Sequence, residues 1–531
     1  MYSIYGSEIN GRFYFTGLSN FENLTPYRYA RDIYLSDDRH VGMNILSPNA
    51  YAQVQTTLTP GLDITAGVRM DYANYLTRAN FNQAVYDNLG LKTDNKLATF
   101  QVQPRVQITW DVNRNSRDIV RLGGGILGSA LNPYSMINNM LFDGTHIVSV
   151  DISGNVVPTP DFPLYRQNPA TAPGLDLFKN AAIPKLVTIN MNGKDAKVPV
   201  VYKMNASYSH FFSNRFRATI NGYLSFGRNN YMYVDRNMVD QPYFRIGAED
   251  NRGVYVPAST INATNGSADW TQGRKTTEVG RVLELISDGK VNQMAIVLDG
   301  EYRYFKDGSI AFSYTWNDAK DNTSYNGNVA NTATLALMVK DDPRSLSRIS
   351  YSDNQFRNKV VVYGTAPSFW GVSAGLRFSG ISGTRYSMIV NGNVNGDFVA
   401  TNDLAFVYDP NDAKTPQYLK DGVNAILNNP NVEESAKNYL RKNIGKIAER
   451  NGGVNPFYGT LDLRLSKRIK LYNKAYIEPS VEVFNVANVL NKKWGVDHSI
   501  GNTSLFSIKN FDALANTYTY SVNTNAGVSS L

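Results

Sequence analysis

A loop rich in asparagine and aspartate is the strongest candidate for chemistry in this chain of 531 residues. Its polar side chains stand at the spacing of an EF-hand loop, which places oxygen ligands at alternate positions and a glycine at the sixth. The potential ligands are Asn391, Asn393, Asn395, Asp397 and Asp403. Neutral amides replace most of the usual carboxylates, and Asn402 stands where a bidentate glutamate is needed. The sequence therefore predicts a structural Asn-Gly turn, with no cofactor beyond weakly bound Ca²⁺.

Three glycines, Gly123, Gly125 and Gly128, match the G-x-G-x-x-G fingerprint of dinucleotide-binding proteins. That fingerprint binds pyrophosphate only where a helix follows at once, because the helix N-terminus holds the anion. Residues 131–134, which include Pro133, do not begin an amphipathic helical pattern. We therefore expect a glycine-rich strand, in which the missing side chains allow neighbouring groups to approach closely.

Composition excludes several other kinds of function. The chain has no cysteine, which excludes disulfides, thiolate metal sites and cysteine nucleophiles. Its four histidines are scattered, and no serine lies in a recognisable nucleophile elbow. The 53 basic and 45 acidic residues give a net charge of +8, but the basic residues form no stripe of the kind that binds nucleic acid. We expect neither an enzyme nor a nucleic-acid-binding protein.

Alternation of apolar and polar residues, the period of a β-strand, dominates the chain. Between residues 102 and 112, valine, isoleucine and tryptophan alternate with glutamine, arginine and threonine. Similar runs cover 64–71, 216–226, 294–304, 310–316, 372–378, 461–465 and 475–483. Several runs have about ten residues, the length that a tilted strand needs to cross a bilayer. Each predicted strand has one apolar and one polar face.

The connections between these runs are of two kinds. Residues 58–61 and 306–309 have the composition of tight turns, whereas 135–200, 228–290 and 379–456 are long and polar. Short turns on one side and long loops on the other are typical of outer-membrane barrels. Together with an aromatic content of 12%, they favour an all-β fold, a transmembrane antiparallel β-barrel with long extracellular loops. A soluble β-rich binding protein is the alternative.

One segment, residues 409–452, breaks the strand pattern. Thr415 is a candidate N-cap with Pro416 at the first helical position, and Asn431 with Glu434 resembles a capping box. Apolar residues then recur at helical spacing. We expect a small helical insert within an extracellular loop, packed over the neighbouring loops.

Several segments together resemble the barrel portion of Oar-like TonB-dependent outer-membrane receptors of Bacteroidota-type bacteria. They occur in the family's order and span residues 11–495. The segments are 11–16 (GRFYFT), 50–53 (AYAQ), 58–62 (LTPGL), 67–71 (GVRMD), 103–106 (QPRV), 121–125 (RLGGG), 393–397 (NVNGD), 402–404 (NDL), 448–452 (AERNG), 461–464 (LDLR) and 484–495 (FNVANVLNKKWG). The family's barrel has 22 strands, preceded by a signal sequence and a plug domain. The resemblance therefore implies that residues 1–531 are an incomplete barrel without the plug and without the final strand.

The resemblance also implies a function in the outer membrane of a Gram-negative bacterium. Substrate would bind to the extracellular loops and the plug, and the TonB-ExbB-ExbD energy complex, acting through the missing N-terminal part, would drive import. The ligand class stays open between peptide, glycan and metal chelate. The apolar faces would contact outer-membrane lipids, and the polar alternates would face the lumen and pair with plug charges. These lumen-facing candidates are Arg69, Arg105, Arg217, Glu478 and Glu482.

Two further interpretations keep the barrel but change its role. One is a SusC-like glycan importer partnered by a surface lipoprotein, against which the NVNGD and NDL segments argue. The other is a barrel that transports nothing and serves adhesion or envelope structure.

Overall fold

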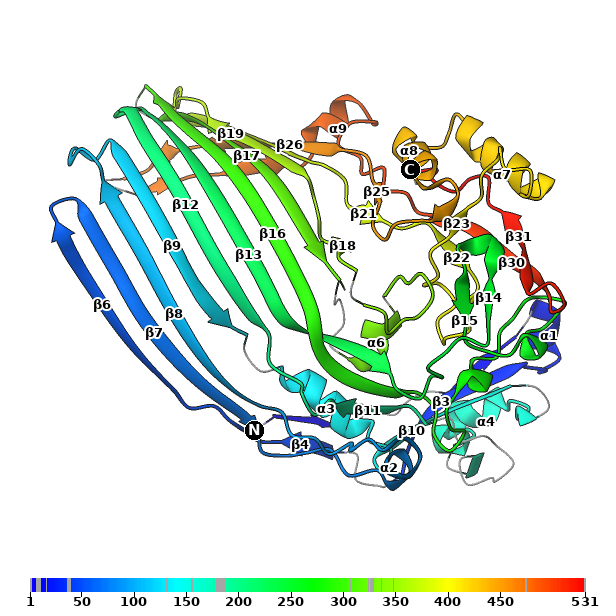
Figure 1. Ribbon diagram of the computed structural model, residues 1–531. Coiled ribbons are helices and arrows are strands. Elements are labelled where there is room, and N and C mark those ends of the chain that lie inside the picture. The colour runs from blue at the N-terminus through cyan, green and yellow to red at the C-terminus, as the bar shows by residue number, and fades with distance from the viewer. Residues whose placement is uncertain are drawn as a thin grey trace.

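One large sheet dominates the structure, and smaller elements gather at one end of it (Figure 1). In the element order, strands far outnumber short helices. No helix in the described part of the chain is long and apolar enough to cross a membrane. This computed structural model describes all residues except 1, 6–10, 16, 36–39, 130–131, 154–155, 175, 178–186, 306, 323, 325–328, 336, 347, 473–474 and 530–531.

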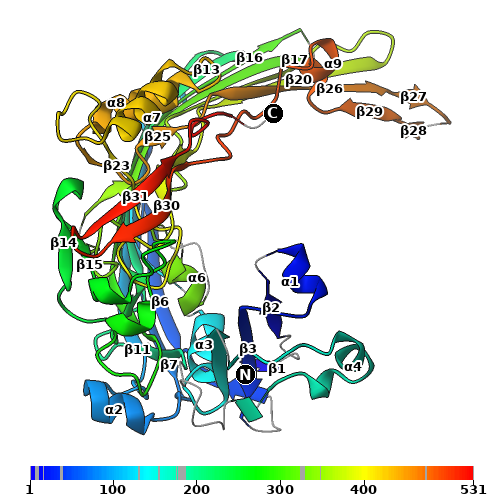
Figure 2. The ribbon, with the colours of Figure 1, turned by 90° about the vertical axis from the view of Figure 1, so that its right-hand side faces the viewer.

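Most strands of the 15-stranded sheet form a meander, in which each strand pairs antiparallel with the next. Figure 2 shows that the sheet curves into a wall shaped like an open C. Among the described residues, the two outermost strands of the meander do not pair with each other. In order along the meander, the strands are β6 (Asn49–Thr59), β7 (Leu62–Tyr75), β8 (Ala98–Asp111), β9 (Asp118–Gly128), β12 (Val200–Ser213), β13 (Phe216–Asp235), β16 (Val282–Tyr304), β17 (Gly308–Asp321), β19 (Asn358–Thr365), β20 (Val372–Ile381), β26 (Tyr458–Lys467) and β29 (Ser480–Val483).

The strand register gathers apolar side chains on one face of this wall. Met70 of β7 lies opposite Val102 of β8, and Leu62 lies opposite Trp110, whereas the intervening Arg69 lies opposite Gln103. Side chains on the apolar face stay exposed, although a large apolar patch is costly in water. The predicted strand pattern is confirmed, and it gives the wall one apolar and one polar face.

Two central strands extend well past the length that a membrane requires. β13 has 20 residues and β16 has 23, about twice the nine to eleven that cross a bilayer. The predicted bounds of the loop 228–290 are therefore wrong at both ends, because β13 continues to Asp235 and β16 begins at Val282.

The predicted strand 475–483 is also wrong, since it divides into β28 (Tyr476–Ile477) and β29. Pro479, between the two, has no backbone N–H for a ladder.

Short turns join the meander strands at one end, and long connections join them at the other. The first turn places Gly61 at a φ of 87°, which glycine adopts without steric cost. The predicted turn 306–309 joins β16 to β17, although residue 306 is outside the described residues. This asymmetry confirms the sequence prediction, and two long connections that we did not predict add to it. The long connections are 76–97, 129–199, 236–281, 322–357 and 382–457.

The long connections 236–281 and 382–457 and the C-terminal segment after β29 together form a compact unit with its own apolar core, which we call the loop lobe. It comprises residues 244–261, 385–454 and 500–528, and Figure 1 shows its elements at the right. Its strands are β14 (Phe244–Ile246), β15 (Arg252–Val254), β21 (Arg385–Tyr386), β22 (Ile389–Asn391), β23 (Phe406–Val407), β24 (Lys446–Ile447), β25 (Gly453–Val454), β30 (Ser504–Asp512) and β31 (Thr517–Val522). Its helices are α7 (Gln417–Asn428) and α8 (Glu434–Asn443).

Both helices of the loop lobe begin later than their sequence signals indicate. Pro416 occupies the N-cap of α7 with an extended backbone, and no side chain caps this helix. Asn431 does not cap α8, which begins three residues later, at Glu434. Val432 instead bridges Val528, and the Glu433 N–H donates to the Gly527 carbonyl. Pairing with the C-terminal segment holds this stretch extended, so the helix starts after it.

The N-terminal elements and the earlier long connections form a second group around two smaller apolar cores. Its strands are β1 (Tyr2–Tyr5), β2 (Arg12–Tyr14), β3 (Arg28–Tyr34), β4 (His40–Met43), β10 (Ile147–Ser153) and β11 (Ile189–Asn192). Its helices are α1 (Leu18–Glu22), α2 (Gln83–Leu89), α3 (Pro133–Leu141) and α4 (Phe162–Gln167).

The three glycines of the fingerprint lie within β9, as the sequence analysis predicted. A Cβ on Gly123 would lie 2.5 Å from the Asn205 side chain, and one on Gly125 would lie 2.9 Å from the Arg105 Cγ. Glycine is needed here because large polar side chains of neighbouring strands cover the backbone. Our reading of the following residues is wrong, because α3 begins at Pro133 with Asn132 as its N-cap. The glycines nevertheless belong to a strand, so they form no phosphate-binding turn.

We predict that an arginine on the apolar face destabilises the sheet far more than one on the polar face. Leu298 and Val297 are neighbours in β16; Leu298 lies between Ile220 and Tyr314, and Val297 lies between Asn221 and Thr315. Leu298→Arg should cost about 2–4 kcal/mol, because the sequence assigns the apolar face to lipid, where a charge is costly. Urea unfolding from lipid vesicles measures this cost, with Val297→Arg as the matched control. Equal costs for the two variants would contradict the assignment of the faces.

Candidate functional site

The polar face of the wall carries the charged residues that the sequence assigned to the lumen. Arg69 binds Asp71 through its Nε at 2.9 and 3.0 Å and through Nη2 at 2.8 Å. Gln103 donates to the same carboxylate, and Arg105 Nη2 donates to the side-chain oxygen Oε1 of Gln103 at 3.2 Å. β7 and β8 thus hold a continuous row of hydrogen-bonded polar side chains.

Ion pairs within the wall also hold the remaining lumen candidates. Arg217 binds Glu301 of the neighbouring strand at 3.1 Å. Glu482 lies 3.5 Å from Arg464. Glu478, in the short segment before β29, binds Arg468 at 3.0 Å. In the described part of the chain these side chains pair with their own neighbours, because cross-strand positions on one face are close enough for ion pairs. Pairing with plug charges stays a prediction.

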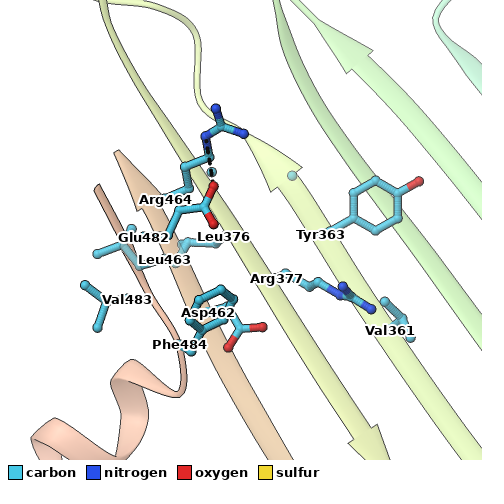
Figure 3. Close-up of a pocket in the computed structure, with 12 residues that line it drawn as sticks. Val361, Tyr363, Leu376, Arg377, Asp462, Leu463, Arg464, Glu482, Val483 and Phe484 are labelled. Atoms are coloured by element: carbon cyan, nitrogen blue, oxygen red, sulfur yellow. Dashed lines mark ion pairs between the residues drawn. The ribbon is translucent and has the colours of Figure 1, made fainter. Parts of the chain in front are cut away.

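A cavity of about 570 Å³ opens on the polar face near the last strands of the meander. Figure 3 shows the Arg464–Glu482 ion pair at one side and Arg377 at the other. Asp462 accepts the Asn485 backbone N–H at 2.9 Å, which fixes the segment after β29. Tyr363 and Phe484 add aromatic surface. The cavity is a polar niche with aromatic edges that can contact whatever occupies the space inside the wall.

A buried charge network links the segments of the loop lobe. Arg252 is fully buried, and its Nε donates to Glu249 at 2.9 Å. Its two terminal nitrogens donate to the carbonyls of Lys340 at 2.9 Å and Leu404 at 2.6 Å, and Nη1 lies 3.5 Å from Asp403. Arg252, in the connection 236–281, therefore joins the connections 322–357 and 382–457 at one buried point.

Two tyrosines extend the network through hydrogen bonds to Glu249. Tyr520 of β31 donates to Glu249 Oε1 at 2.5 Å, and Tyr408 donates to the same oxygen at 3.1 Å. Burial raises the pKa of Asp403 to about 7, against the opposing effect of the Arg252 charge. Burial likewise raises the pKa of the Tyr520 hydroxyl. Arg252, Glu249 and Asp403 are almost completely buried, so removing one partner leaves a charge without solvation.

The residues of the candidate calcium loop lie beside this network. Asn393 accepts the Gly396 N–H at 2.8 Å, and Asn391 donates to Ser507 at 3.4 Å. Asp403 Oδ2 accepts backbone N–H groups, the nearer at 2.8 Å.

The carboxylate of Asp397, like that of Asp403, is surrounded by hydrogen-bond donors of the protein. It accepts the Val399 N–H at 2.6 Å and the side chains of Asn395 and Asn402 at 3.2 and 2.8 Å. Within the described residues, no three acidic, histidine or cysteine side chains are grouped to hold a metal ion. Calcium binding stays a prediction of the sequence, and it would require these protein donors to leave the two carboxylates.

The sequence analysis did not find Arg252, Glu249, Tyr408 or Tyr520. These residues span more than 270 positions, and none belongs to a recognisable motif. The one available signal was the segment around Asp403, which we interpreted as a turn with weak calcium binding.

We predict that Arg252→Met destabilises the loop lobe by about 3–5 kcal/mol, because it leaves buried carboxylates without their counter-charge. Hydrogen exchange of the lobe amides measures the change in the detergent-solubilised protein. Arg441→Met is the matched control, since Arg441 is exposed on α8 and pairs with Glu434 at 2.6 Å; it should leave the exchange unchanged. Equal exchange in the two variants would show that Arg252 does not hold the lobe together.

Solved structures of outer-membrane transporters resemble this fold at very low sequence identity. One is the FrpB iron transporter from Neisseria meningitidis, with 8% identity, a TM-score of 0.42, and coverage of 94% of this chain and 44% of that one. Another is the outer membrane transporter YddB from Escherichia coli, with 10% identity, a TM-score of 0.40, and coverage of 93% and 59%. A third is the siderophore receptor PiuA from Acinetobacter baumannii, with 9% identity, a TM-score of 0.38, and coverage of 87% and 40%.

The chain spans about half the length of these structures. No curated protein sequence matches it. The family model described as "Outer membrane beta barrel domain" matches residues 28–510, which is most of the chain. The apolar face of the wall is thus its lipid-facing side, and the chain belongs to the outer membrane beta barrel domain family.

Proposed function

We propose that this chain forms the wall and the ligand-binding loops of an outer-membrane receptor that imports a substrate into the periplasm. The observation that carries the proposal is the loop lobe. A barrel needs only short connections to complete its strands, yet here the long connections build a separate unit with its own core and a buried charge network. Such an ordered unit at one end of a membrane wall is suited to holding a ligand.

The loop lobe and the long connections lie on the extracellular side in this proposal, and the short turns lie in the periplasm. Outer-membrane barrels have their long loops outside and their short turns inside. The polar face of the wall, with its niche near Arg377 and Glu482, surrounds the route that the substrate takes.

The energy for import comes from the TonB-ExbB-ExbD complex. The support for this step is the resemblance of the ordered segments between residues 11 and 495 to Oar-like TonB-dependent receptors. The resemblance also places a plug domain within the wall. The charged side chains of the polar face pair with one another. The plug would therefore bind mainly through hydrogen bonds and packing, and it could move without breaking these ion pairs.

We predict that substrate uptake by cells carrying the full-length receptor needs both the proton gradient and the loop lobe. The ligand that co-purifies with the receptor from growth medium, identified by mass spectrometry, serves as the labelled substrate. A protonophore should abolish uptake but leave surface binding intact. Deleting residues 409–450, which removes α7 and α8, should lower both uptake and binding at least tenfold.

The control replaces residues 113–115 of the short turn after β8 with glycine and serine, which should change neither property. Heat-modifiable migration in detergent checks that every variant still forms a barrel. Uptake that continues with protonophore would refute the energy coupling and favour a barrel that serves adhesion. Normal uptake by the deletion variant would refute the role of the lobe.

A further inference from the structure

A cleft of about 600 Å³ lies between α2, β11 and the outer ends of β13 and β16. Three segments that are distant in sequence form its sides: the residues after α2, the turn after β11, and residue 275 of the connection 236–281. Its floor includes Met191, which is buried, and the partly buried Leu89 and Leu91. This volume is in the usual range for a small-molecule site.

Cationic side chains dominate the lining of this cleft. They are Lys92, Lys194, Arg236 and Lys275, and they face the single carboxylate of Glu284. Arg236 pairs with Glu284, and Lys275 binds Asp240 at 2.7 Å. In the part of the chain that the structure describes, Lys92 and Lys194 form no ion pair. The cleft therefore presents two uncompensated positive charges.

The fold holds these two lysines on facing segments through a reciprocal pair of amides. Asn95 donates through Nδ2 to the carbonyls of Lys92 and Asn192, both at 2.8 Å. Asn192, itself buried, donates back to the Asn95 carbonyl at 3.3 Å. Segments 97 residues apart are thus fixed together, although this brings like charges into one cleft. Two like charges held close favour a bound anion between them.

The number and type of the free cations indicate the chemistry of that anion. A phosphate monoester carries about −1.5 to −2 charges near neutral pH, which two lysines balance, whereas a single carboxylate would leave one lysine uncompensated. Lysine also binds phosphate as a point charge and needs no forked geometry. The apolar floor of Leu89, Leu91 and Met191 gives a surface for the ring or chain that bears the phosphate.

We propose that this cleft is a binding site for a phosphate monoester, with Lys92 and Lys194 as the residues that hold the phosphate. The phosphate could belong to a soluble ligand, such as a sugar phosphate, or to the headgroup of a membrane lipid. The proposal goes beyond the proposed function, because phosphate binding needs no transport. A receptor that binds the probe without importing anything would support the site and refute the import.

Calorimetric titration of the full chain in detergent, at low ionic strength, tests the proposal. The soluble probe is glucose 1-phosphate, with glucose for comparison. The lipid probe is lipid A in nanodiscs, with its dephosphorylated form for comparison. Lys92→Gln combined with Lys194→Gln should weaken binding of at least one phosphorylated probe tenfold or more, and arginine at both positions should retain binding. The matched control is Lys470→Gln with Lys493→Gln, exposed residues after β26 and after β29 that lie outside both the cleft and the loop lobe, which removes the same charge elsewhere.

If the glutamine pair weakens binding of the sugar phosphate, the natural ligand is a soluble phosphate monoester. If it weakens binding of lipid A, the natural ligand is a lipid headgroup. Either result supports the phosphate site. The proposal is overturned if the glutamine pair leaves the affinity for both phosphorylated probes unchanged, or if the control pair weakens binding equally. It is also overturned if the dephosphorylated probes bind as well as the phosphorylated ones. Heat-modifiable migration of each variant shows that a loss of binding is not a loss of fold.

Discussion

Backbone hydrogen bonding inside the membrane is the constraint on which the rest of this structure depends. Hydrocarbon offers no partners for N–H and C=O groups, so a strand must bond to its neighbours along its whole span. The long antiparallel ladders from β6 to β29 meet this need. Once the ladder fixes the register, alternate side chains must face lipid, and the apolar residues of the chain occupy those positions.

The loop lobe, at the end of the same strands, is ordered by different interactions from those of the wall. Outside the hydrocarbon, the connections can reach water, so they need an apolar core and satisfied buried charges to become ordered. Arg252 provides this order by joining β15 to the segment of Asp403, while Tyr520 joins β31 to the same point through Glu249. A lobe held by its own apolar core and by buried charges, and not by the ladder of the membrane wall, is free to specialise for a ligand without changing that wall.

The strands of the membrane wall could be predicted from the sequence because the alternation of apolar and polar residues is visible within each short run. A run such as 102–112 shows its two faces by alternation alone, and β8 forms there. β12 and β19 were missed: β12 carries Tyr208 and His210 on the otherwise apolar face, and β19 contains the continuous run Val360–Val362. The buried network was not predictable, because Arg252, Asp403 and Tyr520 meet only after three distant segments fold together. Nothing in the spacing of these residues distinguishes them from exposed polar residues.

The side of the membrane on which the loop lobe lies can be measured directly, because the chain has no native cysteine. Single cysteines at Asn411 in the lobe and at Asn214 in the turn between β12 and β13 would be labelled in intact cells with a membrane-impermeant maleimide. The account predicts that Asn411→Cys reacts at once, whereas Asn214→Cys reacts only after the outer membrane is permeabilised. Labelling of Asn214→Cys in intact cells while Asn411→Cys stays protected would contradict the account.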